Sequence, residues 1–122
     1  MNLYQEQLLD HYKNPRHAGV LENPTFTVEE YNPSCGDRVT VYGIIADGVL
    51  VAASFMGKGC VISQAASSML LELMVGKGLL EIRKMKKDDI LNVIGIELGP
   101  TRLRCAMLGL EALHRGISDD QE

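Results

Sequence analysis

The sequence lacks the long apolar run that a membrane protein needs, since no 18 consecutive residues are all apolar. A helix that spans a bilayer requires about 20 such residues, so we expect no membrane segment. A secretory signal is also missing, because residues 1–10 carry two acidic side chains and no basic one. We therefore expect a cytoplasmic protein, in which cysteine thiols stay reduced.

A basic stripe is absent as well. The chain has 12 Lys and Arg against 16 Asp and Glu, a formal net charge of −4. Binding to nucleic acid needs cations that neutralise phosphates, so a nucleic-acid partner is not expected. The one positive run is Arg83–Lys87. It is either a solvated helix face or turn, or a docking patch for an acidic protein.

Paired cysteines are missing too. The three cysteines are 25 and 45 residues apart, with no Cys-x-x-Cys among them, at Cys35, Cys60 and Cys105. An odd number of thiols cannot all form disulfides, and this spacing is not that of a zinc finger. No Ser-His-Asp arrangement or glycine-rich phosphate loop is recognisable either. A site built from these cysteines has to be assembled by the fold.

Each cysteine lies in a small-residue loop or near a helix start, with a basic residue close by. The surrounding segments are Pro33–Arg38, Gly57–Cys60 and Arg102–Cys105. A thiol near a cation or a helix N-terminus is shifted towards thiolate, the form that binds metal or carries sulfur. A single intracellular cysteine is usually a small buried hydrophobe, but this context, found three times, indicates sulfur or metal chemistry.

The hydrophobic pattern predicts a single α+β domain with a three-stranded antiparallel sheet covered by helices on one face. Asp47-Gly48 is a strong hairpin signal. Gly116 is expected to end the last helix and residues 117–122 to fray. The expected strands are Thr25–Tyr31, Val39–Ile45 and Val49–Met56, and the expected helices are Leu3–Lys13, Cys60–Val75, Leu79–Met85, Lys87–Val93 and Pro100–Arg115.

Asp37, two residues after Cys35, allows two interpretations. It is either a turn carboxylate that accepts a backbone N–H, or an oxygen ligand that joins three thiolates in a tetrahedral site. Gly36 and Gly59 would let the backbone bend closely around such a metal or cluster.

The histidines are poorer candidate ligands. His114 lies roughly 13 Å along the predicted last helix from Cys105. His11 and His17 flank Asn14-Pro15, and we expect them to fix the end of the first helix.

With these residues in view, the chain resembles the U-type family of iron–sulfur cluster assembly proteins, which comprises IscU, SufU and the N-terminal domain of NifU. The resemblance extends over nearly all of residues 1–122, which would form one such domain. It is carried by motifs that occur in the family's order, namely Asp10–Arg16, Asn32–Asp37, Gly57–Met69 and Arg104–Leu113.

The resemblance implies that Cys35, Asp37, Cys60 and Cys105 bind a transient [2Fe–2S] cluster or iron, and Zn²⁺ in the cluster-free form. Cys35 and Cys105 become candidate acceptors of persulfide sulfur. The implied partners are a pyridoxal-phosphate cysteine desulfurase and iron–sulfur client or carrier proteins. The implied role is a scaffold rather than an enzyme, and the alternative is a zinc-dependent sulfurtransferase that accepts the persulfide.

Two features divide the family's branches. Arg104 precedes the third cysteine, as in the SufU branch, where the IscU branch has histidine, and Gly99–Leu103 replaces the IscU proline-rich segment. The SufU insertion of about twenty residues between the second and third cysteines is missing. We expect a scaffold because of this length. A plain structural zinc domain is disfavoured, because such sites usually have close-spaced ligand pairs.

Overall fold

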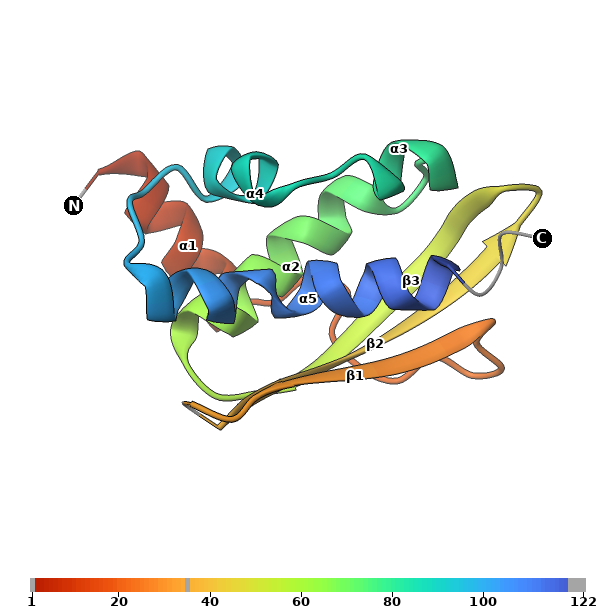
Figure 1. Ribbon diagram of the computed structural model, residues 1–122, viewed down its shortest axis with the longest axis horizontal. Coiled ribbons are helices and arrows are strands. Elements are labelled where there is room, and N and C mark those ends of the chain that lie inside the picture. Colours follow the sequence, from red (N-terminus) through yellow and green to blue (C-terminus); the bar gives the residue numbers. More distant parts are fainter. Residues whose placement is uncertain (1, 35, 119–122) are drawn as a thin grey trace.

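A three-stranded antiparallel sheet carries the fold (Figure 1). The computed structural model describes residues 2–34 and 36–118. The strands are β1 (Phe26–Asn32), β2 (Asp37–Ala46) and β3 (Val49–Lys58), in that spatial order. Asp47 and Gly48 both have positive φ angles, 52° and 74°, which join β2 to β3 in the tight turn that the Asp-Gly pair predicts.

In the described part of the chain five helices accompany the sheet. The two long ones, α2 (Val61–Met74) and α5 (Pro100–Ser118), pack on one of its faces (Figure 1). The helices α1 (Leu3–Lys13), α3 (Leu79–Arg83) and α4 (Lys87–Ile94) pack against α2 and α5. This confirms the predicted α+β fold with helices on one face. Among the described helices, none has the length and apolar character needed to cross a membrane.

Small residues let α2 and α5 approach closely. A Cβ atom at Gly109 of α5 would lie 2.8 Å from Ser67 Oγ of α2, so only glycine fits there. The buried hydroxyls on this face of α2 donate to carbonyls of the same chain segment, Ser67 to Ser63 and Ser63 to Cys60. Polar groups that are satisfied locally can be buried without a large penalty. The close packing brings the first turns of α2 and α5 to the same end of the sheet.

The segment after α1 is held by the two histidines that flank Asn14-Pro15. His11 Nδ1 lies 2.8 Å from Ser68 Oγ of α2, and the same oxygen accepts the Arg16 N–H at 2.8 Å. The His17 carbonyl accepts the Phe55 N–H, so this segment lies along the free edge of β3. His11 thus anchors the end of α1 to α2 through its side chain, whereas His17 contributes a backbone carbonyl to the contact with β3.

The end of α5 differs from the prediction. Gly116 does not end the helix, which continues to Ser118, and Ile117 is fully buried. A Cβ atom at Gly116 would lie 2.2 Å from the Phe26 ring of β1. Glycine is therefore required by contact with the sheet and not by a turn. The frayed tail was a wrong prediction for residues 117 and 118, and residues 119–122 lie outside the described part.

We predict that His11 makes folding sensitive to acid. Burial lowers the pKa of His11 below its ordinary value of 6.5, Arg16 lowers it further, and Glu72 and Asp10 only partly oppose this. The unfolded chain then binds the proton more readily than the folded chain below pH 6.5. The stability contributed by neutral His11 is complete above that pH and is lost as pH falls through the lower folded pKa.

The test is urea unfolding of the wild type and His11→Gln at several pH values between 5 and 8. Glutamine can still hydrogen-bond to Ser68 but does not titrate. The free energy of unfolding should fall less steeply with acid in the variant. Parallel curves would contradict the assignment.

Candidate metal centre

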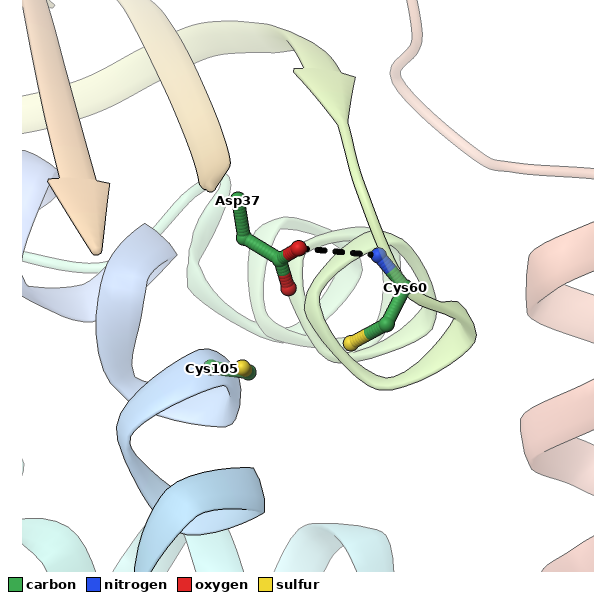
Figure 2. A group of neighbouring side chains, drawn as sticks. All are labelled: Asp37, Cys60 and Cys105. Atoms are coloured by element: carbon green, nitrogen blue, oxygen red, sulfur yellow. Dashed lines mark hydrogen bonds between the residues drawn. The ribbon is translucent and has the colours of Figure 1, made fainter. Parts of the chain in front are cut away.

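Asp37, the first residue of β2, pairs with Asn32 across the sheet and is only 3% exposed. Its Oδ1 atom accepts the Cys60 N–H at 3.2 Å (Figure 2). Its Oδ2 atom is also buried but has no hydrogen-bond partner among the described residues. Asp37 thus accepts a backbone N–H, as one interpretation predicts, and leaves a second oxygen for a ligand, as the other requires.

Cys60 immediately precedes α2 and has an extended backbone, with φ −74° and ψ 166°. Its side chain is exposed, unlike those of the other described residues at this site. The unpaired N–H groups and the positive end of the helix dipole favour an anion at this position. The sulfur of Cys60 can therefore be reached from outside the protein.

Cys105 lies in the second turn of α5 and is 3% exposed. Its neighbour Arg104 is exposed. The buried amide Nδ2 of Asn32 lies 3.8 Å from Cys105 Sγ. The sequence motif included Asn32, but nothing in the local pattern indicated that it reaches a cysteine 73 residues away.

The structure brings three of the predicted site residues together, from three separate elements (Figure 2). One ligand atom each of Asp37, Cys60 and Cys105 lies within 4.8 Å of the others. Ligands of a tetrahedral zinc ion are about 3.8 Å apart, so a small closure would let all three bind one ion. Cys35, the fourth predicted ligand, lies outside the described residues. No histidine joins this group within residues 2–34 and 36–118.

The donors present fit a thiophilic metal ion. A buried carboxylate oxygen without a hydrogen-bond partner is costly unless a cation or donor reaches it. Here such an oxygen, on Asp37, lies beside two thiols, the donor type that selects zinc and iron–sulfur clusters. Zinc accepts thiolate and carboxylate ligands in one site.

The carboxyl group of Asp37 is held in its ionised form. Burial alone would raise its pKa, but the polar hydrogens of Cys60 and Cys105 favour the carboxylate, and the pKa lies below its ordinary value of 3.8. An ionised carboxylate is the form that coordinates a metal. Asp37 therefore needs no proton release at neutral pH before it can act as a ligand.

A hollow of about 740 Å³ opens beside this group of residues. Cys60 and Cys105 line it, together with Leu8 of α1, Ile62 of α2 and Ile96 of the α4–α5 connection. Its wall is mainly apolar, and it leaves a path from outside to the two cysteines. Chemistry at these thiols would take place in this hollow.

Fold and residues together define an α+β protein in which two cysteines and a carboxylate meet at one end of the sheet. The family model of the NifU-like N terminal domain matches residues 3–122. The chain belongs to this family, which confirms the resemblance seen in the sequence.

Relatives from both branches match nearly the whole chain. The zinc-dependent sulfurtransferase SufU of Bacillus subtilis is 34% identical over 136 positions, with 98% of this chain and 92% of that protein covered. The iron-sulfur cluster assembly scaffold protein IscU of Escherichia coli is 33% identical over 120 positions, with 95% and 92% covered. Sequence identity to these relatives therefore does not show whether the chain is closer to the SufU branch or to the IscU branch.

A solved structure with the same fold is that of a Fervidobacterium islandicum protein, FiSufU, assigned as an iron-sulfur cluster assembly scaffold protein for the SUF system. It is 29% identical, with a TM-score of 0.77, and 90% of this chain and 93% of that chain are covered.

Gly59 gives a specific test of this site. Its φ angle is +137°, and a Cβ atom there would lie 2.1 Å from Asp37 Oδ1. We expect Gly59→Ala to displace the carboxylate and weaken zinc binding by at least about tenfold, the loss typical when an outer-shell partner is removed. Chelator competition measures this affinity.

Gly76→Ala is the matched control, since Gly76 also has a positive φ angle, +93°, but a Cβ atom there meets nothing within 4 Å. It should lose stability through backbone strain alone and keep the wild-type affinity for zinc. Equal affinities in the two variants would show that Gly59 does not shape the site.

Proposed function

We propose that this protein is an iron–sulfur cluster assembly scaffold, in which residues 1–122 act as one domain and Cys35, Asp37, Cys60 and Cys105 are the ligands. The observation that supports this most directly is the convergence of Asp37, Cys60 and Cys105 from three elements. The cluster is cargo in this role. It is built on the protein and then passed to iron–sulfur client or carrier proteins.

The donor set suits a ligand that must be both held and released. Thiolates are soft ligands that bind iron and zinc firmly, whereas a carboxylate oxygen is hard and exchanges more readily beside them. Asp37 is buried, yet one of its oxygens is already engaged by the Cys60 N–H. Its single remaining oxygen would therefore be the weakest point in the ligand set.

The sulfur would come from a cysteine persulfide on a pyridoxal-phosphate cysteine desulfurase. A thiolate of this chain attacks the outer sulfur of that persulfide. The S–S bond of the donor breaks, the donor cysteine leaves as a thiolate, and the outer sulfur becomes a persulfide on this chain. Cys35 and Cys105 are the proposed acceptors, and Cys105 can be approached through the hollow that it lines.

Zinc-dependent sulfur transfer is the second candidate, and Arg104 favours it. A guanidinium offers no lone pair to a metal, so this position cannot supply the additional ligand that an imidazole could. In this reading the four ligands bind Zn²⁺ in the cluster-free protein, and one cysteine accepts sulfur for delivery to another protein.

The length of the chain favours the scaffold function over sulfur transfer. The alignment with B. subtilis SufU runs over 136 positions, more than the 122 residues of this chain, so SufU contains residues that have no counterpart here. The alignment with E. coli IscU runs over 120 positions. For this reason we rank the scaffold function above sulfur transfer.

We also propose that the protein acts in the cytoplasm, where reduced thiols persist.

A sulfur-transfer assay separates the two roles. The untagged protein, with its native metal, is mixed anaerobically with a cysteine desulfurase, cysteine and ferrous iron. Dithiothreitol, which reduces persulfide sulfur to the sulfide of a cluster, is added to the half used for absorption and left out of the half used for mass spectrometry. A scaffold should develop the visible absorption of a [2Fe–2S] cluster, which Cys35→Ala, Cys60→Ala or Cys105→Ala should each abolish. Zinc-dependent stimulation of the desulfurase without a stable cluster, with extra sulfur on one cysteine by mass spectrometry, would instead establish sulfur transfer.

Asp37→Ala should make a reconstituted cluster more persistent, because the exchangeable oxygen ligand is removed. The measurement is the decay of visible absorbance after a chelator is added. Asp88→Ala, on the exposed first turn of α4, is the control and should decay like the wild type. If the cluster absorbance decays as fast in Asp37→Ala as in the wild type, this role of the carboxylate is ruled out.

A further inference from the structure

Asn32 connects two parts of the proposed site that lie far apart in the sequence. It is the last residue of β1 and is only 5% exposed. Its carbonyl accepts the Gly36 N–H at 2.8 Å and its Oδ1 atom accepts the Ser34 N–H at 3.1 Å. Its Nδ2 atom lies 3.8 Å from Cys105 Sγ on α5. Asn32 thus holds the segment after β1 with both its backbone and its side chain, and the side chain also reaches a cysteine on α5.

The surroundings settle which way the Asn32 amide is turned. A backbone N–H can pair with an amide oxygen but not with an amide NH₂ group, so the Ser34 N–H requires Oδ1 on its side. The NH₂ group must then face Cys105. The sulfur therefore meets a hydrogen-bond donor, which stabilises the negative charge that a thiolate carries when it binds a metal.

We propose that Asn32 is a positioning residue for Cys105, which orients its sulfur towards the metal centre and stabilises it there by an N–H···S hydrogen bond. This inference rests on the proposed function. Outer-shell donors of this kind orient the ligand and tune the metal, and their removal typically weakens binding 10- to 100-fold.

The first measurement is zinc affinity, obtained by competition with a chelator. We expect Asn32→Ala to bind zinc about tenfold more weakly than the wild type. Asn14→Ala is the matched control, because the Asn14 amide donates to Asp10 at the end of α1 and not to a thiol. It should keep the wild-type affinity. Unchanged affinity in Asn32→Ala would overturn the proposal.

A purely structural role in the turn predicts different behaviour, which double mutants can reveal. If Asn32 acts through Cys105, Asn32→Ala should cause no further loss in a Cys105→Ala background, yet should retain its tenfold effect in a Cys60→Ala background. If Asn32 only closes the turn, the loss should be the same in all backgrounds. That second outcome would overturn the proposal.

Asn32→Asp provides a second variant should alanine disturb folding. Aspartate keeps an oxygen for the Ser34 N–H but presents an acceptor, not a donor, to the Cys105 sulfur. It should bind zinc at least as weakly as Asn32→Ala. Wild-type affinity in Asn32→Asp would show that the turn contact alone matters and would overturn the proposal.

Cobalt gives a spectroscopic readout that does not depend on activity. Removing a donor from a ligand sulfur raises the energy of its lone pairs. The sulfur-to-cobalt charge-transfer band of Asn32→Ala should therefore move to longer wavelength, and that of Asn14→Ala should not. An unmoved band would overturn the proposal while leaving the proposed function intact. A first shell of nitrogen and oxygen alone, seen by X-ray absorption of the wild type, would overturn both.

Discussion

The hydrogen bond from the Cys60 N–H to Asp37 Oδ1 is the contact on which the proposed site depends. It joins the first residue of β2 to the residue that precedes α2, so a strand and a helix meet with their functional side chains adjacent. The bond is possible only because Gly59 has no Cβ atom, which would otherwise occupy the place of the carboxylate. It satisfies one oxygen of Asp37 and leaves the other beside the thiols.

The packing of α5 against α2 brings Cys105, the remaining described residue of the proposed site, into place. Because Gly109 lets α5 lie directly on Ser67, Cys105 is carried to the same end of the sheet as Cys60. The resulting centre is unequal in exposure, since Asp37 and Cys105 are buried while Cys60 is exposed. Such a site can shield its cargo from water on one side and exchange it on the other.

The four proposed donors would serve either a scaffold or a sulfur-transfer function. What distinguishes them is how firmly a metal holds the thiols, because a thiolate bound tightly to zinc is not free to bind iron. In the roles proposed above, Asn32 and Asp37 would act on this balance in opposite directions. The Asn32 donor would stabilise a metal-bound sulfur of Cys105, whereas the oxygen of Asp37 would provide a ligand that exchanges readily.

The sequence by itself determined the features that depend on neighbouring residues. The helix over 3–13, the Asp47-Gly48 turn and the three-stranded sheet follow from local periodicity and turn chemistry, and the loop and helix-start contexts of the cysteines indicate a thiolate site. Only the tertiary structure decided that Asp37 meets Cys60, that Asn32 meets Cys105 and that α5 continues through Gly116. These three depend on contacts between segments 23 to 90 residues apart, as for Gly116 against Phe26. Local patterns do not encode such contacts, because side-chain packing and not intrinsic preference selects the residue there.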